Sequence, residues 1–158
     1  IYNDGTGTPV VRNSIIWGNE GGDQIEYVSA APDVQYSVVQ GSYSGTGNLS
    51  IDPDFVRDPS PGDGNWATSW DNDNGDLHLL TTSNAIDAGD NTAVPPDTVD
   101  LDSDGNVTEP LPYDLDSTRR FTDMGAVADT GNGTAPIVDM GAYEYPRQCV
   151  YLPLIAKD

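Results

Sequence analysis

The sequence is poor in basic residues. It contains 6 Lys and Arg against 26 Asp and Glu, which gives a formal net charge of −20 at pH 7. Nucleic acid and anionic membrane surfaces are therefore excluded as charge-driven partners, because both carry the same sign as the chain. At this charge the compact state also repels itself, so we expect screening salt or bound divalent cations, Ca²⁺ first among them, to neutralise clustered carboxylates.

Cysteine, long apolar runs and helix-forming residues are also scarce. The single cysteine, Cys149, excludes an internal disulfide framework and a cysteine-based zinc site. No apolar run approaches the roughly 20 residues that a membrane span needs. Glu and Lys are rare while Gly, Asp, Asn, Ser and Thr abound, which disfavours helices and predicts an all-β chain. The chain opens at Ile1 with neither an initiator Met nor a signal peptide, and we expect it to be the processed end of a longer protein.

An internal repeat is the main organising feature of the first half. Residues 13–19 (NSIIWGN) and 36–42 (YSVVQGS) align without gaps, with Ser14 matching Ser37. The distance between the two copies is typical of one turn of a β-solenoid, in which each turn buries its apolar strip by stacking on the next. Residues 24–28 (QIEYV) alternate polar and apolar side chains and predict a strand on a second face of the same turn.

The second half shows shorter signals. Residues 58–76 form a long loop rich in Gly, Asn and Asp, and residues 77–80 (LHLL) predict that a strand resumes there. Residues 123–127 (DMGAV) return as residues 139–143 (DMGAY). We expect both copies to be short strands, entered through an Asp and bent at a Gly. No segment has a convincing helical period.

The order of these motifs carries a resemblance to a known family. The motifs are NSIIWGN at 13–19, YSVVQG at 36–41, DPDFV at 52–56, DLHL at 76–79, NAIDAGD at 84–90, DLD at 114–116 and DMGAYEY at 139–145. Together they resemble the choice-of-anchor Q type region, the closing part of bacterial surface proteins with a pectate-lyase-like fold. The resemblance implies an all-β, right-handed parallel β-helix end with long acidic loops, in a secreted protein at the cell surface. It implies no shared catalytic centre.

We divide the chain into a β-helix domain, residues 1–146, and an apolar tail, residues 147–158. The tail has the length of a strand and is too short to span a membrane. It either folds back over the last turn or adds as a strand to a neighbouring copy or a surface scaffold, which would build filaments. Cys149, at its root, is a buried thiol, an intermolecular link or a lipid site. The assembly residues expected in the tail are Cys149, Val150, Tyr151, Leu152, Leu154 and Ile155.

The strongest chemical signal is the acidic loop that begins at residue 100. Asp100, Asp102 and Asp104 stand at positions 1, 3 and 5, followed by Gly105, a pattern that wraps carboxylate oxygens around Ca²⁺. Position 12 is Leu111 rather than a bidentate Glu, so the loop is not an EF-hand and its last ligand must be another acid. An acidic turn that faces solvent is the alternative. The further candidate ligands are Asn106, Thr108, Glu109, Asp114 and Asp116.

A second acidic loop, residues 71–76 (DNDNGD), has the same alternation of oxygen-bearing side chains. Asp71, Asp73 and Asp76 are its candidate ligands for a weaker calcium site. Because Asn-Gly is an ordinary turn former, a turn without an ion is the alternative.

Few residues are suited to catalysis. The one histidine, His78, lies in an alternating strand, where we expect it to face solvent. Pectate-lyase-like enzymes pair Ca²⁺ with a basic residue that removes a proton beside a uronate carboxylate, and Arg119 and Arg120 follow the calcium loop. We expect both arginines to pair instead with aspartates. No catalytic residue is therefore predicted, and a polysaccharide lyase is the enzymatic alternative.

Carbohydrate binding rests on three tryptophans, Trp17, Trp66 and Trp70. Trp66 and Trp70 flank a short polar loop, where exposed indoles would stack on sugar rings, and packing of this loop onto the solenoid is the alternative. The sequence thus predicts a non-catalytic, calcium-stabilised extracellular module for attachment, display or self-assembly. Its expected partners are copies of itself, a surface scaffold or glycans. The alternative is a module that binds or cleaves acidic polysaccharides.

Overall fold

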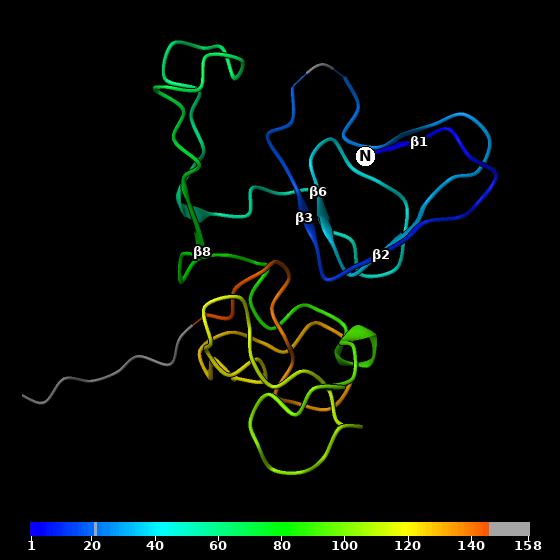
Figure 1. The fold of residues 1–158 in the computed structure, drawn as a ribbon, viewed down its shortest axis with the longest axis vertical. Helices are drawn as coiled ribbons and strands as arrows, with labels where there is room; N and C mark the ends of the chain where they lie inside the picture. The colour runs from blue at the N-terminus through cyan, green and yellow to red at the C-terminus, as the bar shows by residue number, and fades with distance from the viewer. Residues whose placement is uncertain (21, 146–158) are drawn as a thin grey trace, which may run out of the picture.

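The computed structural model describes residues 1–20 and 22–145 (Figure 1), and the tail predicted at 147–158, with its assembly residues, lies outside them. The described part is all-β with almost no helix, as the composition predicted. No helix in it is long and apolar enough to cross a membrane. Its elements are β1 (Tyr2–Asn3), β2 (Val10–Arg12), β3 (Ile15–Ile16), β4 (Glu26–Tyr27), β5 (Asp33–Gln35), β6 (Val38–Val39), β7 (Phe55–Arg57), β8 (Asp76–Leu79) and the 3₁₀ turn η1 (Asn91–Ala93).

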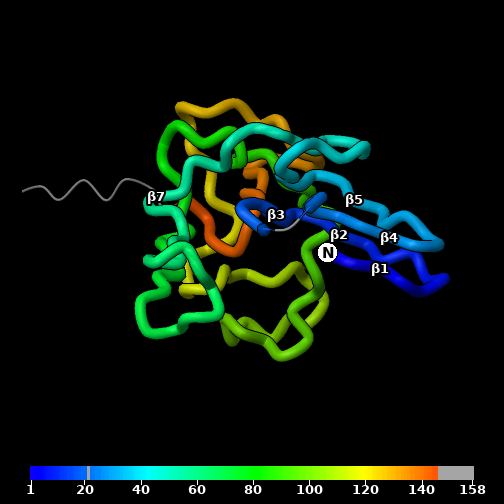
Figure 2. The backbone as a smooth tube through the Cα atoms, turned by 90° about the horizontal axis from the view of Figure 1, so that it is seen from above, coloured from blue at the N-terminus to red at the C-terminus, as the bar shows by residue number. Residues whose placement is uncertain are grey.

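The first six strands form three parallel pairs: β1 with β4, β2 with β5 and β3 with β6. Ile15 lies opposite Val38, which is the offset of the sequence repeat. The pairing predicted from the repeat is therefore observed, in the expected register. We call residues 1–20 the first coil and residues 22–41 the second coil. They run side by side in Figures 1 and 2.

The two coils bend at matching positions. Asn13 and Tyr36, which are equivalent in the repeat, both have a left-handed backbone, with φ of 49° and 47°. Residues other than glycine rarely adopt this backbone conformation, although Asn tolerates it better than most residues. The next residues repeat as well, because the hydroxyls of Ser14 and Ser37 each donate to the carbonyl oxygen two positions before them, at 2.8 and 3.0 Å. The repeat in sequence thus encodes a repeated corner between two strands.

Two apolar clusters form the core. One lies between the coils and contains Ile16, Ile25, Val34 and Val39, with Val11 and Tyr43 packed against it. The other joins the second coil to the rest of the chain through Val38, Leu79, Ala85, Ile86, Ala88 and Met140. Val38 therefore contributes to the contact between the coils and the C-terminal part, and both parts share one continuous packing surface.

An arm projects from the body of the protein, at the upper left of Figure 1. Its base is an antiparallel pair, β7 with β8, in which Phe55 lies opposite Leu79. A strand was predicted around residues 77–80 and is present as β8. It pairs with β7 in antiparallel fashion, as one arm of a hairpin, and not in parallel with a coil. Gly75 allows the close approach, since a Cβ atom there would lie 2.6 Å from the carbonyl oxygen of Arg57.

The C-terminal part, residues 84–145, is held by single backbone hydrogen bonds and by carboxylates rather than by ladders. Residues 123–127 and 139–143 were predicted as strands, and this prediction is wrong: both are turns or bends. For residues 139–143 the physical reason lies in the aspartate that opens the segment. The Asp139 side chain accepts hydrogen bonds from the backbone N–H groups of Asp87 (2.8 Å) and Tyr145 (2.6 Å), which replaces a strand partner.

Candidate metal centre

The acidic loop is closed at its base by the backbone. The N–H of Asp97 donates to the carbonyl oxygen of Glu109 at 2.6 Å, and the N–H of Leu111 donates to that of Pro95 at 2.8 Å. Pro96 and Pro110 form an antiparallel bridge between these two bonds. The loop from Asp97 to Glu109 is therefore a closed ring that brings both ends of the acidic segment together.

The loop curls because several of its residues have a left-handed backbone. Asp100, Ser103 and Gly105 have φ of 55°, 62° and 88°. The N–H of Gly105 donates to Oδ1 of Asp100 at 3.1 Å, which fixes one carboxylate inside the curl. The tight turn that the Asp-x-Asp-x-Asp-Gly pattern predicts is therefore present.

Five carboxylates converge in two groups that share Asp102. The ligand oxygens of Asp100, Asp102 and Asp104 all lie within 4.8 Å of one another, and so do those of Asp97, Asp102 and Glu109. Oδ1 of Asp102 and Oε1 of Glu109 are buried and have no hydrogen-bond partner among the described residues. Oxygen ligands at this density match the preference of Ca²⁺ for six to eight oxygens.

The electrostatics of the loop favour a cation. Burial raises the pKa of the Glu109 carboxyl, and the negative charges of Asp104 and Asp102 raise it further. The Asn106 amide donates to Oε2 of Glu109 at 3.1 Å and opposes this shift only in part. Among the residues that the structure describes, no arginine forms an ion pair with these carboxylates. A bound cation would remove the repulsion between them.

Only some of the predicted ligands lie close together in the structure. Asp100, Asp102 and Asp104 meet, whereas Asp114 and Asp116 belong to neither group of the loop. Asp114 accepts a hydrogen bond from the N–H of Glu144, and Asp116 lies 3.0 Å from a ring nitrogen of His78.

The remaining loop ligands also differ from the predicted set. Oδ1 of Asn106 accepts from the N–H and the hydroxyl of Thr108, which engages both predicted side chains within the loop. Glu109, one of the acids considered for the last ligand, lies in the second acidic group with Asp97 and Asp102. Asp97 was missed, because it precedes the pattern by three residues and its only signal is another acid near the start of the loop.

The second acidic loop does not converge in the same way. Asp71, Asp73 and Asp76 form none of the acidic groups found among the described residues. Asp73 is paired with Arg57, and Asp76 with His78. Two of the three predicted ligands of the second ion are therefore paired with basic side chains of the protein, whereas Asp71 forms none of the ion pairs among the described residues.

His78 connects the arm to the C-terminal part. Its ring nitrogens lie 2.7 Å from Oδ1 of Asp76 and 3.0 Å from Oδ2 of Asp116, and its ring stacks on Tyr143 with centroids 4.1 Å apart. The prediction of a solvent-facing histidine missed these contacts, because residue 116 is far away in sequence. The hydrogen bonds to Asp116 and then to Asp76 raise the pKa of His78.

We expect His78→Phe to remove a pH-dependent part of the stability. Phe can stack on Tyr143 as His78 does, but it cannot pair with the carboxylates of Asp76 and Asp116. Because the folded-state pKa of His78 is raised above 6.5, its contribution is complete below pH 6.5 and is lost as the pH rises through the folded value. Thermal unfolding should show a melting temperature lower by about 2 to 4 °C at pH 6, since the pairs are partly exposed, and less at pH 9. An equal loss at both pH values would contradict the ion pairs.

Two of the three tryptophans and one arginine border hollows in the surface. Trp66 and Trp17 line a pocket of about 340 Å³ between the first coil and the arm, whereas the Trp70 side chain is 81 % exposed. Arg119 lines a hollow of about 200 Å³ together with Asp102 and Glu109 of the acidic loop, and it also lies over the Tyr113 ring. Both arginines were predicted to pair with aspartates; Arg120 instead pairs with a buried glutamate, Glu144, at 3.6 Å.

Comparisons with protein-family models, with curated proteins and with solved structures found no match to this chain.

Proposed function

We propose that this chain is the closing module of an extracellular, right-handed parallel β-helix of the choice-of-anchor Q type, and that it serves attachment, display or self-assembly without catalysis. The observation that carries the proposal is the set of three parallel strand pairs, which share a nearly constant register between the first and second coils. Repeated coils of this kind bury their apolar strip only against a neighbouring coil. A chain that turns twice and then folds into an irregular C-terminal part fits the end of such a stack.

The first coil supports an assembly role. Among the described residues, β1, β2 and β3 each pair with one strand only, so their outer edges carry no further strand. The first coil is also partly apolar outside, with Tyr2 65 % and Val10 66 % exposed. An unpaired edge of this kind accepts another strand. We propose a preceding coil, a second copy or a surface scaffold as its partner.

We also propose that Ca²⁺ stabilises the module through the loop from Asp97 to Glu109. The shared ligand Asp102 and the orphaned Oε1 of Glu109 support this proposal. A cation held there would fix the loop against the base formed by its two ends.

Removal of calcium should lower the stability measurably. Free Ca²⁺ at roughly 100-fold above the dissociation constant is expected to raise the melting temperature by about 5 to 10 °C over that in EDTA. Asp102→Asn should abolish most of this shift, because both acidic groups of the loop lose a ligand. Differential scanning calorimetry in calcium and in EDTA measures both effects.

Asp4→Asn is the matched control, because Asp4 is exposed on the first coil and the change removes the same charge. Its calcium-dependent shift should equal that of the wild type. If Asp102→Asn kept the full shift, calcium binding by this loop would be refuted.

Self-assembly is tested by electron microscopy of the native protein with and without EDTA. Filaments or ordered stacks in calcium would support the assembly role. Monomers in both conditions would remove it, and the proposed strand donation by residues 147–158 with it.

A second candidate function is binding or cleavage of an acidic polysaccharide. The hollow lined by Arg119, Asp102 and Glu109 favours it, because a bound cation and a guanidinium together would hold a uronate carboxylate. Incubation of the purified protein with polyuronates, followed by detection of unsaturated products, tests cleavage. Retention on immobilised polyuronate, compared between the wild type and Arg119→Ala, tests binding. Cleavage would overturn the non-catalytic proposal.

A further inference from the structure

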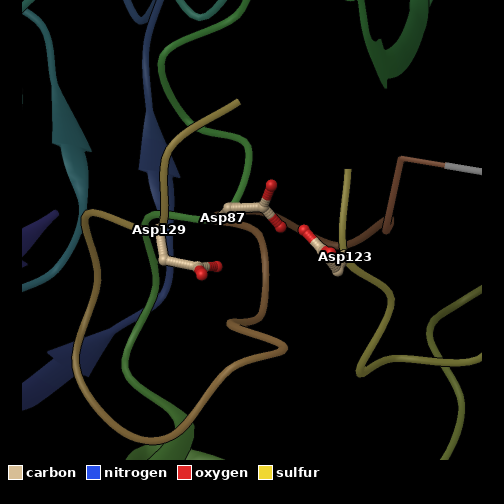
Figure 3. Close-up of side chains that lie close together, drawn as sticks. All are labelled: Asp87, Asp123 and Asp129. Carbon is tan, nitrogen blue, oxygen red and sulfur yellow. The ribbon is translucent and has the colours of Figure 1, made fainter. Parts of the chain in front are cut away.

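A third group of acids lies away from the loop, around the buried residue Asp87. The ligand oxygens of Asp87, Asp123 and Asp129 lie within 4.8 Å of one another. Figure 3 shows the carboxylates of Asp87 and Asp123 directed toward one another, with Asp129 close by. The three residues come from two separate segments of the C-terminal part, one at Asp87 and one at residues 123–129, so the group depends on the tertiary fold.

The backbone holds this group in place. The N–H of Met124, next to Asp123, donates to Oδ2 of Asp87 at 3.3 Å. The N–H of Thr130, next to Asp129, donates to the Asp87 carbonyl oxygen at 2.9 Å. Each flanking aspartate is therefore positioned by a bond between its neighbour and Asp87.

Asp87 provides an independent sign that a ligand belongs here. The residue is 0 % exposed, and its second carboxylate oxygen, Oδ1, is buried without a hydrogen-bond partner in the part of the chain that the structure describes. A buried carboxylate oxygen without a partner is costly, and native structures satisfy such atoms with a donor, a water or an ion.

No basic side chain neutralises the group. In the described part of the chain, Arg12, Arg57 and Arg120 pair with other carboxylates, and Arg119 lies over Tyr113. Burial raises the pKa of Asp87 to about 6, and the charges of Asp123 and Asp129 add to the shift. The three acids therefore repel one another at neutral pH.

The geometry points to a second cation site: we propose that Asp87, Asp123 and Asp129 bind one Ca²⁺ ion and thereby fasten residues 123–130 across the core segment at Asp87. All three side chains offer hard oxygen ligands, and none is a histidine or cysteine, which disfavours zinc. Asp123 and Asp129 are exposed, so water can complete the coordination. The site is separate from the loop of residues 97–109 and does not depend on it.

The test compares calcium binding by the wild type, Asp123→Asn/Asp129→Asn and Asp102→Asn, using isothermal titration with CaCl₂ after removal of metal. The double variant changes only exposed side chains, so its fold is preserved. Asp4→Asn/Asp23→Asn removes the same charge from exposed positions of the two coils and is the matched control. The double variant should bind one calcium ion fewer than the wild type, because it lacks the site at Asp87. The control should bind as many ions as the wild type, and Asp102→Asn should keep the ion at Asp87.

Melting temperatures provide a second readout with a characteristic sign. In EDTA the double variant should melt at a higher temperature than the wild type, because two repelling charges are gone. The increase in melting temperature from EDTA to calcium should be smaller for the double variant than for the wild type. A variant that binds as much calcium as the wild type and melts lower in EDTA would overturn the site. If Asp102→Asn alone lost calcium, the loop site would stand and this one would fall. If the double variant alone lost calcium, this site would stand and the loop site would fall.

Discussion

Replacement of Asp139 by Ala is expected to lower the free energy of unfolding by about 3 to 5 kcal/mol, because one buried and one partly buried backbone N–H group lose their acceptor. Asp139 is 1 % exposed, and its two oxygens accept from the N–H groups of Asp87 and Tyr145. The side chain thus joins the segment around Asp87 to the end of the described chain. Urea unfolding at pH 7, followed by circular dichroism, measures the change.

Two variants sharpen this prediction. Asp139→Asn keeps one acceptor oxygen, so it should cost less than Asp139→Ala. Asp63→Ala removes an exposed aspartate of the arm that accepts one local hydrogen bond, from the N–H of Asn65, and should change stability by well under about 1 kcal/mol. If Asp139→Ala were as mild as Asp63→Ala, the carboxylate would not hold the C-terminal part together.

The environment of Asp139 is acidic as well as buried. Burial raises the pKa of Asp139 to about 7 and that of Glu144 to about 9. Oε2 of Glu144 accepts from the N–H of Asp139 at 3.1 Å, and Arg120 lies beside its other oxygen. Asp139 and Glu144 therefore act as backbone acceptors, which explains why these two acids are buried.

Asn13→Ala is expected to cost about 3 kcal/mol for a different reason. Its side-chain amide donates to the carbonyl oxygen of Asp90 at 2.9 Å and accepts from the N–H of Asp90 at 2.6 Å. Two hydrogen bonds of about 1 kcal/mol each are lost, and the left-handed backbone at φ 49° costs Ala about 1 kcal/mol more. The loss should appear in equilibrium urea unfolding as a lower midpoint.

Asn13→Gly separates these two contributions. Glycine adopts a positive φ without strain but lacks the amide, so it should recover only the backbone part of the loss. Because Gly141 also donates to the Asn13 carbonyl oxygen at 2.9 Å, that bond remains in both variants. Equal stability of the wild type and Asn13→Ala would show that the first coil is not fastened to the C-terminal part through this residue.

The coils could be predicted from the sequence because their signal is local and repeated. Ser14 and Ser37 are matched by their neighbours on both sides, and the parallel register of Ile15 with Val38 follows from the same offset. The acidic loop could be predicted for a similar reason, since a ligand pattern at alternate residues does not depend on distant parts of the chain.

The C-terminal part could not be predicted because its contacts depend on distant residues. The repeated motif that begins at Asp123 and Asp139 resembles a strand locally, yet Asp139 is bound to a backbone 52 residues away. His78 meets Asp116, 38 residues later, and no local pattern indicates that pair. In both cases a single polar side chain makes the contact with a distant residue, and a contact of this kind leaves no periodicity in the sequence.

The central claim is that residues 1–41 form two stacked parallel coils fastened to the C-terminal part. Nuclear Overhauser effects between backbone protons test it most directly in solution. The structure predicts cross-peaks between the backbones of Ile15 and Val38 and of Val11 and Val34, in the parallel pattern, and between Gly141 and Asn13. An antiparallel pattern, or no contact between equivalent residues of the two coils, would contradict it.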